Sequence, residues 1–374
     1  MQTLYDDLMA LCQDKESDAA FYFVEKEVEG FKFHIFNYRL ASYTDFTKPN
    51  ALNCRGTAFQ LVSGGAPVLS SLPFSKFFNL DENPFTIGLD HDKIIEVAEK
   101  RDGSLISTYL YGIGKFGLKS KTSLDSEHAK LAWEVFNTEE YKDLKQEVSE
   151  LIATGSGYTV NFELTTTDPR LKIVIDYPKT ELRVLGVRRH KDGALLGKDF
   201  FHHTGFPSLH KFWVETKVVT GDKAAFVKDI DAMTGIEGFV LKYPNRLVKV
   251  KTDWYRSLHM AKESIDIPSR LFDCIIDESI DDLKVMFKND AFQLEKIRAM
   301  EGKVIPMYNA FIKQVECFVE ENRELERKEF AIKGQEVLPK YLFSLAMMKY
   351  LGKPIDFKSW AKKNIEIFTL GEKI

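Results

Sequence analysis

Short strand-like runs dominate the sequence between about residues 20 and 260, and they constrain the fold more than any other feature. They are rich in Phe, Tyr, Val and Ile and lie between turn residues, a pattern typical of β-strands. The runs are FYFVEKEV, FKFHIFNY, GTAFQLV, SLISTYLYG, FGLKSK, YTVNFEL, KIVIDY, ELRVLGVRR, GFVLKY and RLVKVK. Helical periodicity is found over 3–13, 125–153 and 221–233. Because strands dominate and do not alternate with helices, the sequence predicts an α+β fold.

The sequence changes character between Lys262 and Pro268. Beyond this point, helical periodicity appears over 277–301 and 303–333 and again from Pro339 to Tyr350. Proline and glycine residues that we expect to punctuate these helices are Pro268, Pro306, Gly334, Pro339 and Pro354. We therefore expect a first domain over 1–261 and an all-helical domain over 262–374.

The net charge, the N-terminal sequence and the cysteine spacing bear on the cellular location of the protein and on the kind of partner that it binds. The formal net charge is -4, so a nucleic-acid partner would have to bind a local positive patch. The N-terminus lacks the basic and apolar regions of a signal peptide, and no run is long enough for a membrane span. None of the four cysteines pair at C-x-x-C spacing. These features predict a cytoplasmic protein with reduced thiols and no membrane partner.

The segment Lys100-Arg101-Asp102-Gly103-Ser104 is the strongest candidate for chemistry. A lysine attacks as a nucleophile only when it is neutral, which requires burial or nearby cations to lower its pKa. Gly103 would let the backbone approach a phosphate closely. The alternative is a charged turn before a strand, because Asp-Gly-Ser is common in turns. The segment alone does not decide between these interpretations.

Further motifs follow this segment in a fixed order. They are Lys119-Ser-Lys121, Asn161-Phe162-Glu163, Leu185-Gly-Val-Arg188, Ile236-Glu237-Gly238-Phe239-Val240 and Val248-Lys249-Val-Lys251. Together they resemble the covalent nucleotidyltransferases, which comprise DNA ligases, RNA ligases and mRNA capping enzymes. Five more segments are similar to phage-type RNA ligase 1, the ligase that repairs broken tRNA: Phe36-Asn-Tyr38, Ala41-Ser-Tyr43, Asn53-Cys54-Arg55-Gly56-Thr57, Lys76-Phe77-Phe78-Asn79-Leu80 and Lys251-Thr-Asp-Trp-Tyr255. The resemblance covers nearly the whole chain.

This resemblance implies a fold and a reaction. The fold would be a nucleotidyltransferase domain of ATP-grasp-like antiparallel sheets with flanking helices, followed by an all-helical C-terminal domain. DNA ligases and capping enzymes instead carry a β-rich domain there, and nothing after residue 260 reads as one. In the implied reaction, Lys100 takes AMP from ATP, AMP passes to an RNA 5′-phosphate, and a 3′-hydroxyl attacks that end. A capping guanylyltransferase, a DNA ligase and a non-catalytic RNA-binding protein are the alternatives.

The lysines of the last motif are candidates for binding the α-phosphate. Lys249 and Lys251 alternate with valines, so both point to one face of a strand. There they would stabilise the phosphate and depress the pKa of Lys100. The alternative is the solvated face of an edge strand.

The resemblance also implies roles for two carboxylates. It implies that Glu163 holds a ribose hydroxyl of the nucleotide. Glu237 would help to bind a divalent ion, Mg²⁺ or Mn²⁺, directly or through water. Asp281 is a further metal candidate, although an acidic residue at a helix N-terminus is the simpler interpretation.

Four further residues are expected near the nucleotide. Arg55 and Lys76 would hold the β- and γ-phosphates. Tyr38 would contact the nucleotide or its phosphates, or be an aromatic core residue. Lys121 would lie near the nucleotide or the RNA end, with Lys119 as the weaker alternative. Asp102 and Gly103 would shape the loop after Lys100.

The end of the chain is rich in lysine. Six lysines share the final stretch with Asp356: Lys340, Lys349, Lys353, Lys358, Lys362 and Lys363. Together with the resemblance, they predict a phosphate-binding surface for folded RNA. The resemblance implies the nicked anticodon loop of a tRNA as the partner. The alternative is an ordinary solvated helical surface. Nothing in the sequence demands more than a monomer.

Overall fold

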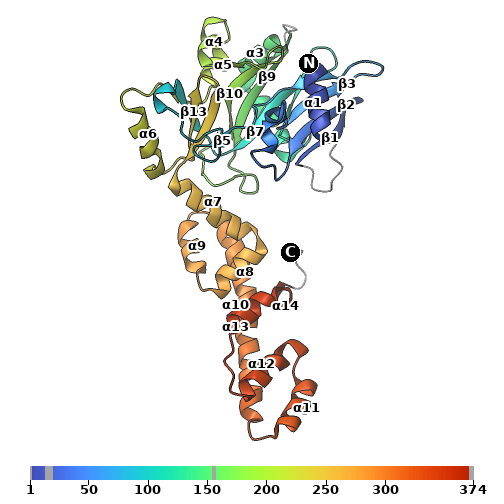
Figure 1. Cartoon of the computed structure of the whole chain (residues 1–374), viewed down its shortest axis with the longest axis vertical. Helices are drawn as coiled ribbons and strands as arrows, with labels where there is room; N and C mark the ends of the chain where they lie inside the picture. The colour runs from blue at the N-terminus through green and yellow to red at the C-terminus, as the bar shows by residue number, and fades with distance from the viewer. Residues whose placement is uncertain (1, 13–19, 154–156, 370–374) are drawn as a thin grey trace. The chain divides into compact units, whose positions relative to one another are not determined.

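The strand-like runs fold into sheets that are packed with helices in the first part of the chain (Figure 1). The computed structural model describes residues 2–12, 20–153 and 157–369. The chain divides into two units, Met1–Arg256 and Ser257–Ile374. The first unit mixes sheets and helices and the second is helical over its described residues, which confirms the predicted α+β fold class. The boundary predicted after residue 261 lies within helix α7 (Asp253–Asp266).

The first sheet is an antiparallel meander in the order β1-β2-β3-β4. Its strands are β1 (Phe21–Val28), β2 (Phe31–Tyr38), β3 (Thr57–Leu61) and β4 (Val68–Ser71). Helix α1 (Gln2–Cys12) packs against it, with Leu8 buried beside Phe36 and Phe59. Short 3-10 turns at Asp45–Thr47 and Ala51–Asn53 lead into β3.

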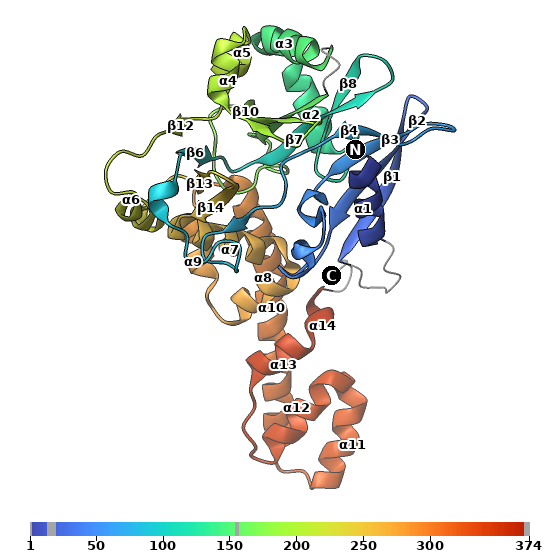
Figure 2. The same ribbon diagram turned by 45° about the horizontal axis from the view of Figure 1, so that its top comes forward.

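The second sheet has the order β11-β10-β9-β7-β8 and is antiparallel. Its strands are β7 (Ser104–Tyr111), β8 (Lys115–Lys119), β9 (Tyr158–Thr165), β10 (Glu181–Arg189) and β11 (Leu195–Leu196). Helices α2 (Glu127–Phe136) and α3 (Lys142–Ala153) cover one face of this sheet (Figure 2). Phe136, Leu144 and Val148 form a core there with Phe162 of β9. Short helices α4 (Lys198–His203) and α5 (Pro207–Lys211) extend this core through Phe201 and Leu209.

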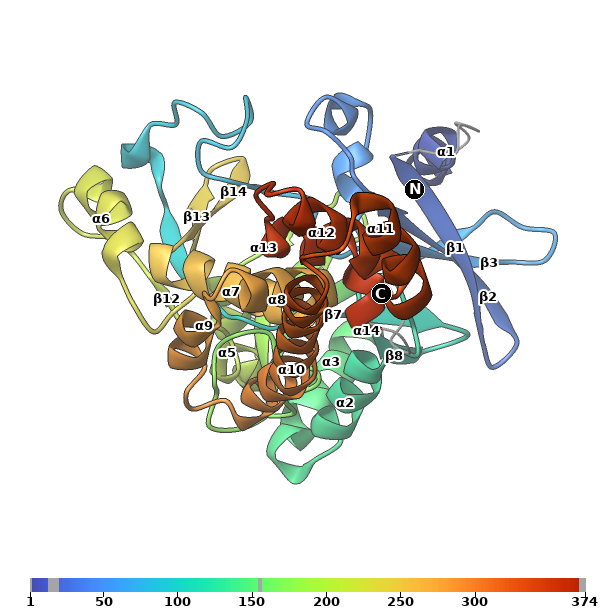
Figure 3. The same ribbon diagram turned by 90° about the horizontal axis from the view of Figure 1, so that it is seen from below.

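The third sheet has the order β12-β6-β13-β14-β5. Its strands are β5 (Phe78–Asn79), β6 (Glu96–Lys100), β12 (Thr216–Lys217), β13 (Gly238–Tyr243) and β14 (Arg246–Lys251). All neighbours are antiparallel except β14 and β5, which run parallel. Helix α6 (Lys223–Asp229) lies beside this sheet (Figure 3) and buries Val227 against Leu241 and Val248. Because α6 covers one face, the other face remains for the candidate site.

Helices α8 to α14 and the end of α7 make up the second unit. They are α8 (Pro268–Ile276), α9 (Ile280–Met286), α10 (Ala291–Glu321), α11 (Arg327–Val337), α12 (Lys340–Tyr350), α13 (Phe357–Lys363) and α14 (Ile365–Thr369). Helix α10 contributes Ile297 and Val304 to one apolar core and Val315 and Phe318 to another. The break predicted between 301 and 303 is therefore wrong, and Pro306 lies inside α10. Apolar residues buried on both sides of Pro306 hold the helix together, which offsets the one hydrogen bond that a proline removes.

The predicted helices 277–301 and 303–333 are also interrupted, between α9 and α10 and between α10 and α11. In the first unit, two more predicted elements differ from the structure for identifiable reasons. The predicted helix 125–153 is interrupted because the Asn137 side chain donates to the Trp133 carbonyl at 2.7 Å and ends α2. The KIVIDY segment is not a strand. Its Val174 and Ile175 backbone N–H groups donate to Asp102 Oδ2 at 2.7 and 2.6 Å instead of to a neighbouring strand. Both differences arise from side chains that satisfy backbone groups, which periodicity cannot reveal.

Candidate active site

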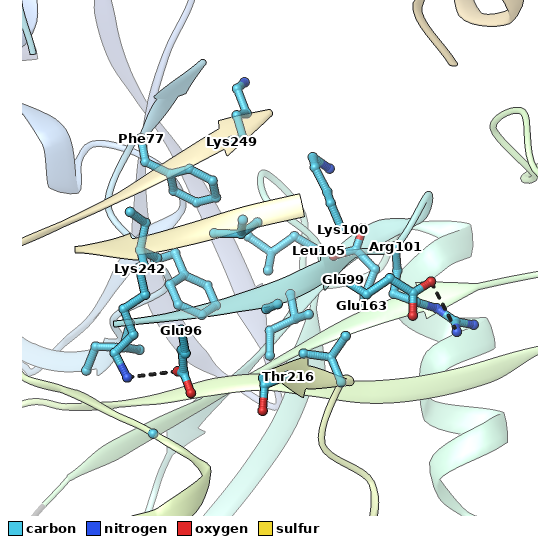
Figure 4. A pocket seen from close by; sticks show the side chains of 18 of the residues that line it. Phe77, Glu96, Glu99, Lys100, Arg101, Leu105, Glu163, Thr216, Lys242 and Lys249 are labelled. Carbon is cyan, nitrogen blue, oxygen red and sulfur yellow. Dashed lines mark hydrogen bonds and ion pairs between the residues drawn. The ribbon is translucent and has the colours of Figure 1, made fainter. Parts of the chain in front are cut away.

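One face of the third sheet forms the floor of a cavity of about 310 Å³ in the first unit. Side chains alternate along a strand, so Glu96, Ala98 and Lys100 of β6 point to the same face. Cross-strand pairing places Gly238 between Lys100 and Lys251. The same register places Lys242 opposite both Glu96 and Leu247. The floor therefore presents lysines at one end and the Glu96–Lys242 pair further along (Figure 4).

The other walls of the cavity come from the first two sheets and the segments between strands. Glu163 of β9 and Leu105 of β7 line it from the second sheet. Further lining residues are Tyr38, Arg55, Phe74, Lys76, Phe77, Leu185, Leu195, Leu196, Trp213 and Val214. Several charged groups converge within mainly apolar walls, which is the composition of a small-molecule site.

Lys100 and Lys251 share one carboxylate. Lys100 Nζ lies 2.8 Å from Glu237 Oε2, and Lys251 Nζ lies 3.1 Å from Glu237 Oε1. The Glu237 side chain is only 3 % exposed, whereas the two lysines are 22 % and 26 % exposed. Gly238 lets β13 start this close to β14, because a Cβ atom there would lie 2.0 Å from the Val250 carbonyl oxygen. A buried carboxylate therefore holds two ammonium groups at the edge of the cavity.

A group of cations surrounds the Tyr38 ring. Lys76 Nζ lies 5.2 Å and Lys121 Nζ lies 4.3 Å from the ring centroid. Burial opposes ionisation of Tyr38, but the charges of Lys76, Lys121 and Arg55 outweigh it and lower the pKa of the phenol. Burial, and next the Lys76 charge, lower the pKa of Lys249 to about 8. Such a concentration of positive charge favours a polyanion such as a triphosphate.

Glu163 is the second buried carboxylate of the cavity. Burial raises its pKa to about 7, although the Lys100 charge opposes the shift. Gly103 allows the loop after Lys100 to contact β9, since a Cβ atom there would lie 2.3 Å from the Leu164 carbonyl oxygen. The close approach that this glycine permits is thus to a neighbouring strand. This contact keeps Lys100 and Glu163 at the same cavity.

Asp102 fastens the loop that follows Lys100. Besides the two N–H groups of Val174 and Ile175, its carboxylate accepts a hydrogen bond from Tyr255 Oη at 2.6 Å. The neighbouring Arg101 pairs with Glu181 at 2.5 Å and lies over the Tyr177 ring at 4.3 Å. The sequence motif thus supplies a nucleophile candidate and, two residues later, the anchor of its loop.

Lys119 at the end of β8 is fully buried. Its Nζ donates to the Ser120 carbonyl at 3.0 Å. Burial, and next the Arg55 charge, lower the pKa of Lys119 to about 7. This lysine therefore has a structural position behind Arg55, and its charge depends on pH near neutrality.

The stability of the protein is expected to rise with pH because of Lys119. Between about pH 7 and its ordinary pKa of 10.5, the unfolded chain binds more protons at this lysine than the folded protein does. The unfavourable free energy of burying Lys119 is thus fully present below about pH 7 and is lost as pH rises to 10.5. Melting temperatures measured across this range should rise in the wild type and change less in Lys119→Met. The exposed Lys115→Met, on the same strand, should retain the rise, and an identical slope in Lys119→Met would contradict this assignment.

The structure brings most of the residues predicted from the sequence to one cavity. Those that line it are Tyr38, Arg55, Lys76, Lys100, Glu163, Lys249 and Lys251. Glu237 contacts two of these lysines, and Lys121 contacts Tyr38. The sequence analysis missed Phe77, Glu96 and Lys242. For Lys242, a charged residue within an apolar strand was the available signal.

The carboxylates present fit a divalent ion that arrives with a nucleotide. Among the described residues, no group of three or more His, Cys, Asp or Glu side chains could hold a metal on its own. Mg²⁺ and Mn²⁺ accept few protein carboxylates when phosphates and water supply the other oxygens. Glu237 and Glu163 are the carboxylates that could complete such a set. Asp281 is exposed in the first turn of α9 in the second unit, beside Lys284 at 3.3 Å, and stays a prediction.

Several of the C-terminal lysines are paired with acidic residues from earlier in the chain. Lys349 pairs with Glu316, Lys358 with Glu278 and Lys362 with Asp277, at 2.7, 2.8 and 2.7 Å. These ion pairs neutralise three of the six lysines that form the positive stretch in the sequence. The predicted phosphate-binding role would therefore fall first to the remaining three, Lys340, Lys353 and Lys363.

Within the described part of the chain, no helix is both long and apolar enough to cross a membrane.

Comparisons with known proteins match both parts of the chain. The RNA ligase family matches residues 53–255, and the C-terminal domain of T4 RNA ligase 1 matches residues 262–370. RNA ligase 1 of bacteriophage TS2126 is 26% identical over 246 residues, which cover 64% of this chain and 59% of the phage protein. A protein of Thermovibrio ammonificans that is named provisionally as an RNA ligase is 27% identical over 297 residues, which cover 74% of each chain. An archaeal ATP-dependent RNA ligase structure covers 94% of this chain and 93% of its own, with 15% identity and a TM-score of 0.47. Because the RNA ligase match spans more than half of the sequence, the chain belongs to the RNA ligase family, of the T4 RNA ligase 1 type.

Proposed function

We propose that this RNA ligase uses ATP to form an AMP–lysine intermediate on Lys100 and repairs cleaved tRNA. The observation that supports the proposal is the placement of Lys100 at one cavity with Arg55, Lys76, Lys249 and Lys251. One nucleophile and four cations suit attack on a phosphorus atom with a pyrophosphate leaving group. A capping enzyme would use GTP in the same first step.

In the first step, Nζ of Lys100 attacks the α-phosphorus of ATP. The N–P bond forms, the bond from the α-phosphorus to its bridging oxygen breaks, and pyrophosphate leaves with the electron pair. Lys100 must lose a proton to attack, and Glu237 Oε2 at 2.8 Å is placed to accept it. Lys249 and Lys251 stabilise the charge that develops on the phosphate. Arg55 and Lys76 bind the leaving pyrophosphate, and Tyr38 and Lys121 lie beside them.

A divalent ion and Glu163 complete the proposed site. Mg²⁺ or Mn²⁺, when bound with ATP, would neutralise phosphate charge and polarise the phosphorus centre. Glu237 and Glu163 would supply its protein oxygens. Glu163 would also hold a ribose hydroxyl, and its raised pKa allows it to donate as well as accept near neutral pH.

In the later steps the AMP moves to RNA. A 5′-phosphate oxygen of an RNA end attacks the phosphorus of the lysine-bound AMP. The new O–P bond forms, the N–P bond breaks, and Lys100 leaves as its amine. The 3′-hydroxyl of the other end then attacks the activated 5′-phosphate and AMP leaves. We assign the first unit to this chemistry and the helical second unit to tRNA binding, in the cytoplasm of an infected cell and as a monomer.

Sealing of a tRNA nicked in its anticodon loop tests the substrate. With ATP and Mg²⁺, we expect joining of a 5′-phosphate to a 3′-hydroxyl, and none when the 5′ end is a hydroxyl. Changing Lys340, Lys353 and Lys363 together to Ala should slow sealing of the nicked tRNA while adenylation of the enzyme stays intact. The exposed Lys142→Ala is the control. Equal sealing of nicked tRNA by the triple variant and the wild type would contradict the tRNA-binding assignment.

A further inference from the structure

The Glu96–Lys242 ion pair occupies the end of the cavity away from Lys100. Glu96 Oε1 lies 2.9 Å from Lys242 Nζ, and the two side chains are 24 % and 31 % exposed. They are direct cross-strand partners of β6 and β13 and both line the cavity. Figure 4 shows this pair well apart from Lys100 and Lys249. Nothing in the proposed lysine adenylation uses it.

The position of the pair matches the base end of a bound nucleotide. Glu96 lies four residues before Lys100 on the same strand and the same face, which is about 13 Å along the strand. A nucleoside monophosphate attached at Lys100 can extend over this separation. Between the two ends, Ala98 and Val240 are cross-strand partners without polar groups, and Thr216 and Lys249 flank them on the neighbouring strands. A short apolar strip of floor that ends in two charged groups suits a flat aromatic base with a polar edge.

Gly197 leaves space for the end of the Lys242 side chain. A Cβ atom on Gly197 would lie 3.2 Å from Lys242 Nζ, so a larger residue there would press on the ammonium group. The glycine therefore leaves the end of Lys242 open beside the cavity.

We propose that Glu96 and Lys242 read the edge of the purine and select adenine. This inference rests on the proposed binding of ATP in the same cavity. Adenine presents a 6-amino donor beside the N1 acceptor, and guanine presents an O6 acceptor beside an N1–H donor. Glu96 accepts from the 6-amino group and Lys242 donates to N1, so the order of acceptor and donor on the protein matches adenine. A site that binds a substrate donor in this way rejects an analogue that lacks it.

Covalent labelling with three nucleotides tests this assignment. The full chain is incubated with Mg²⁺ and α-labelled ATP, GTP or purine riboside triphosphate, which lacks the 6-amino group, and single-turnover rates are compared. The wild type should prefer ATP over purine riboside triphosphate by about 10- to 100-fold. Glu96→Ala should lose most of this ratio. Glu29→Ala, which removes an exposed carboxylate paired with Lys115 at 2.7 Å, should retain it.

A double variant in which Glu96 and Lys242 exchange their charges keeps the ion pair, so a change in its nucleotide preference is not explained by loss of that pair. In the double variant Glu96→Lys with Lys242→Glu, the acceptor and the donor change places, so the rate with GTP relative to ATP should rise at least about tenfold. A wild-type ratio of ATP to purine riboside triphosphate in Glu96→Ala, or an unchanged GTP to ATP ratio in the exchanged pair, would overturn the inference and leave lysine adenylation standing. No covalent label from any nucleotide on the wild type would overturn the proposed function and this inference with it.

Discussion

Glu237→Gln is expected to slow transfer of AMP to the enzyme by about 10²- to 10⁴-fold, the range attributed to a positioned proton acceptor. The amide keeps the size of the side chain, but it cannot take the proton that Lys100 must lose. It also leaves the ammonium groups of Lys100 and Lys251 without the carboxylate that now separates their charges. The single-turnover rate with labelled ATP measures this directly.

The pH dependence distinguishes loss of the proton acceptor from a general disturbance. In Glu237→Gln the proton has to pass to solvent, so the rate should rise more steeply with pH than in the wild type. Glu140→Gln is a matched control, because Glu140 forms an ion pair of 2.8 Å with Lys179 on the exposed surface. A Glu237→Gln rate and pH profile equal to those of the wild type would exclude this role for Glu237.

Asp102→Ala is expected to destabilise the first unit by about 4.5 kcal/mol or more, because it removes three hydrogen bonds to a buried charged group that contribute about 1.5–3 kcal/mol each. The lost bonds are those that the carboxylate accepts from the backbone N–H groups of Val174 and Ile175 and from the Tyr255 hydroxyl. The loop that holds Lys100 would lose its anchor, so adenylation should fall as well. Because the chain has two units, amide exchange at Val174 and Ile175 is a better measure than global melting.

Two variants separate the anchor from a general effect of losing an aspartate. Asp102→Asn retains an oxygen that can accept both N–H groups, so it should lose less stability than Asp102→Ala. Asp192→Ala removes an exposed aspartate that accepts from the Ala194 N–H at 3.1 Å, and it should change little. Amide exchange at 174 and 175 that stays slow in Asp102→Ala would show that Asp102 does not anchor the loop.

Strand content and the order of motifs could be predicted from the sequence because both are local. Residues 21–28 and 31–38 form β1 and β2 as their aromatic and β-branched composition between turn residues predicts. The adjacency of the last two motifs follows from the short turn that joins β13 and β14. The resemblance of the motifs named cationic residues that the structure brings to one cavity, and the family comparison confirms the RNA ligase assignment.

The contacts that could not be predicted join residues distant in the chain. KIVIDY has the composition of a strand, yet Asp102, some 70 residues earlier, takes its N–H groups. Lys349, Lys358 and Lys362 read as a positive stretch, yet acidic residues from earlier in the chain neutralise them. Lys242 is one charged residue of the strand-like run GFVLKY, and its place at the cavity depends on the pairing of β13 with β6. Each of these depends on tertiary contacts that carry no signal in the local pattern.

The central claim is that Lys100 carries AMP, and covalent labelling with peptide mapping tests it most directly. The purified chain is incubated with Mg²⁺ and α-labelled ATP, denatured, digested and mapped. We predict label that survives denaturation, is located on Lys100 and is absent from Lys100→Ala, while Lys93→Ala, an exposed lysine just before β6, labels like the wild type. Label on a different residue, or equal label in Lys100→Ala, would contradict the account.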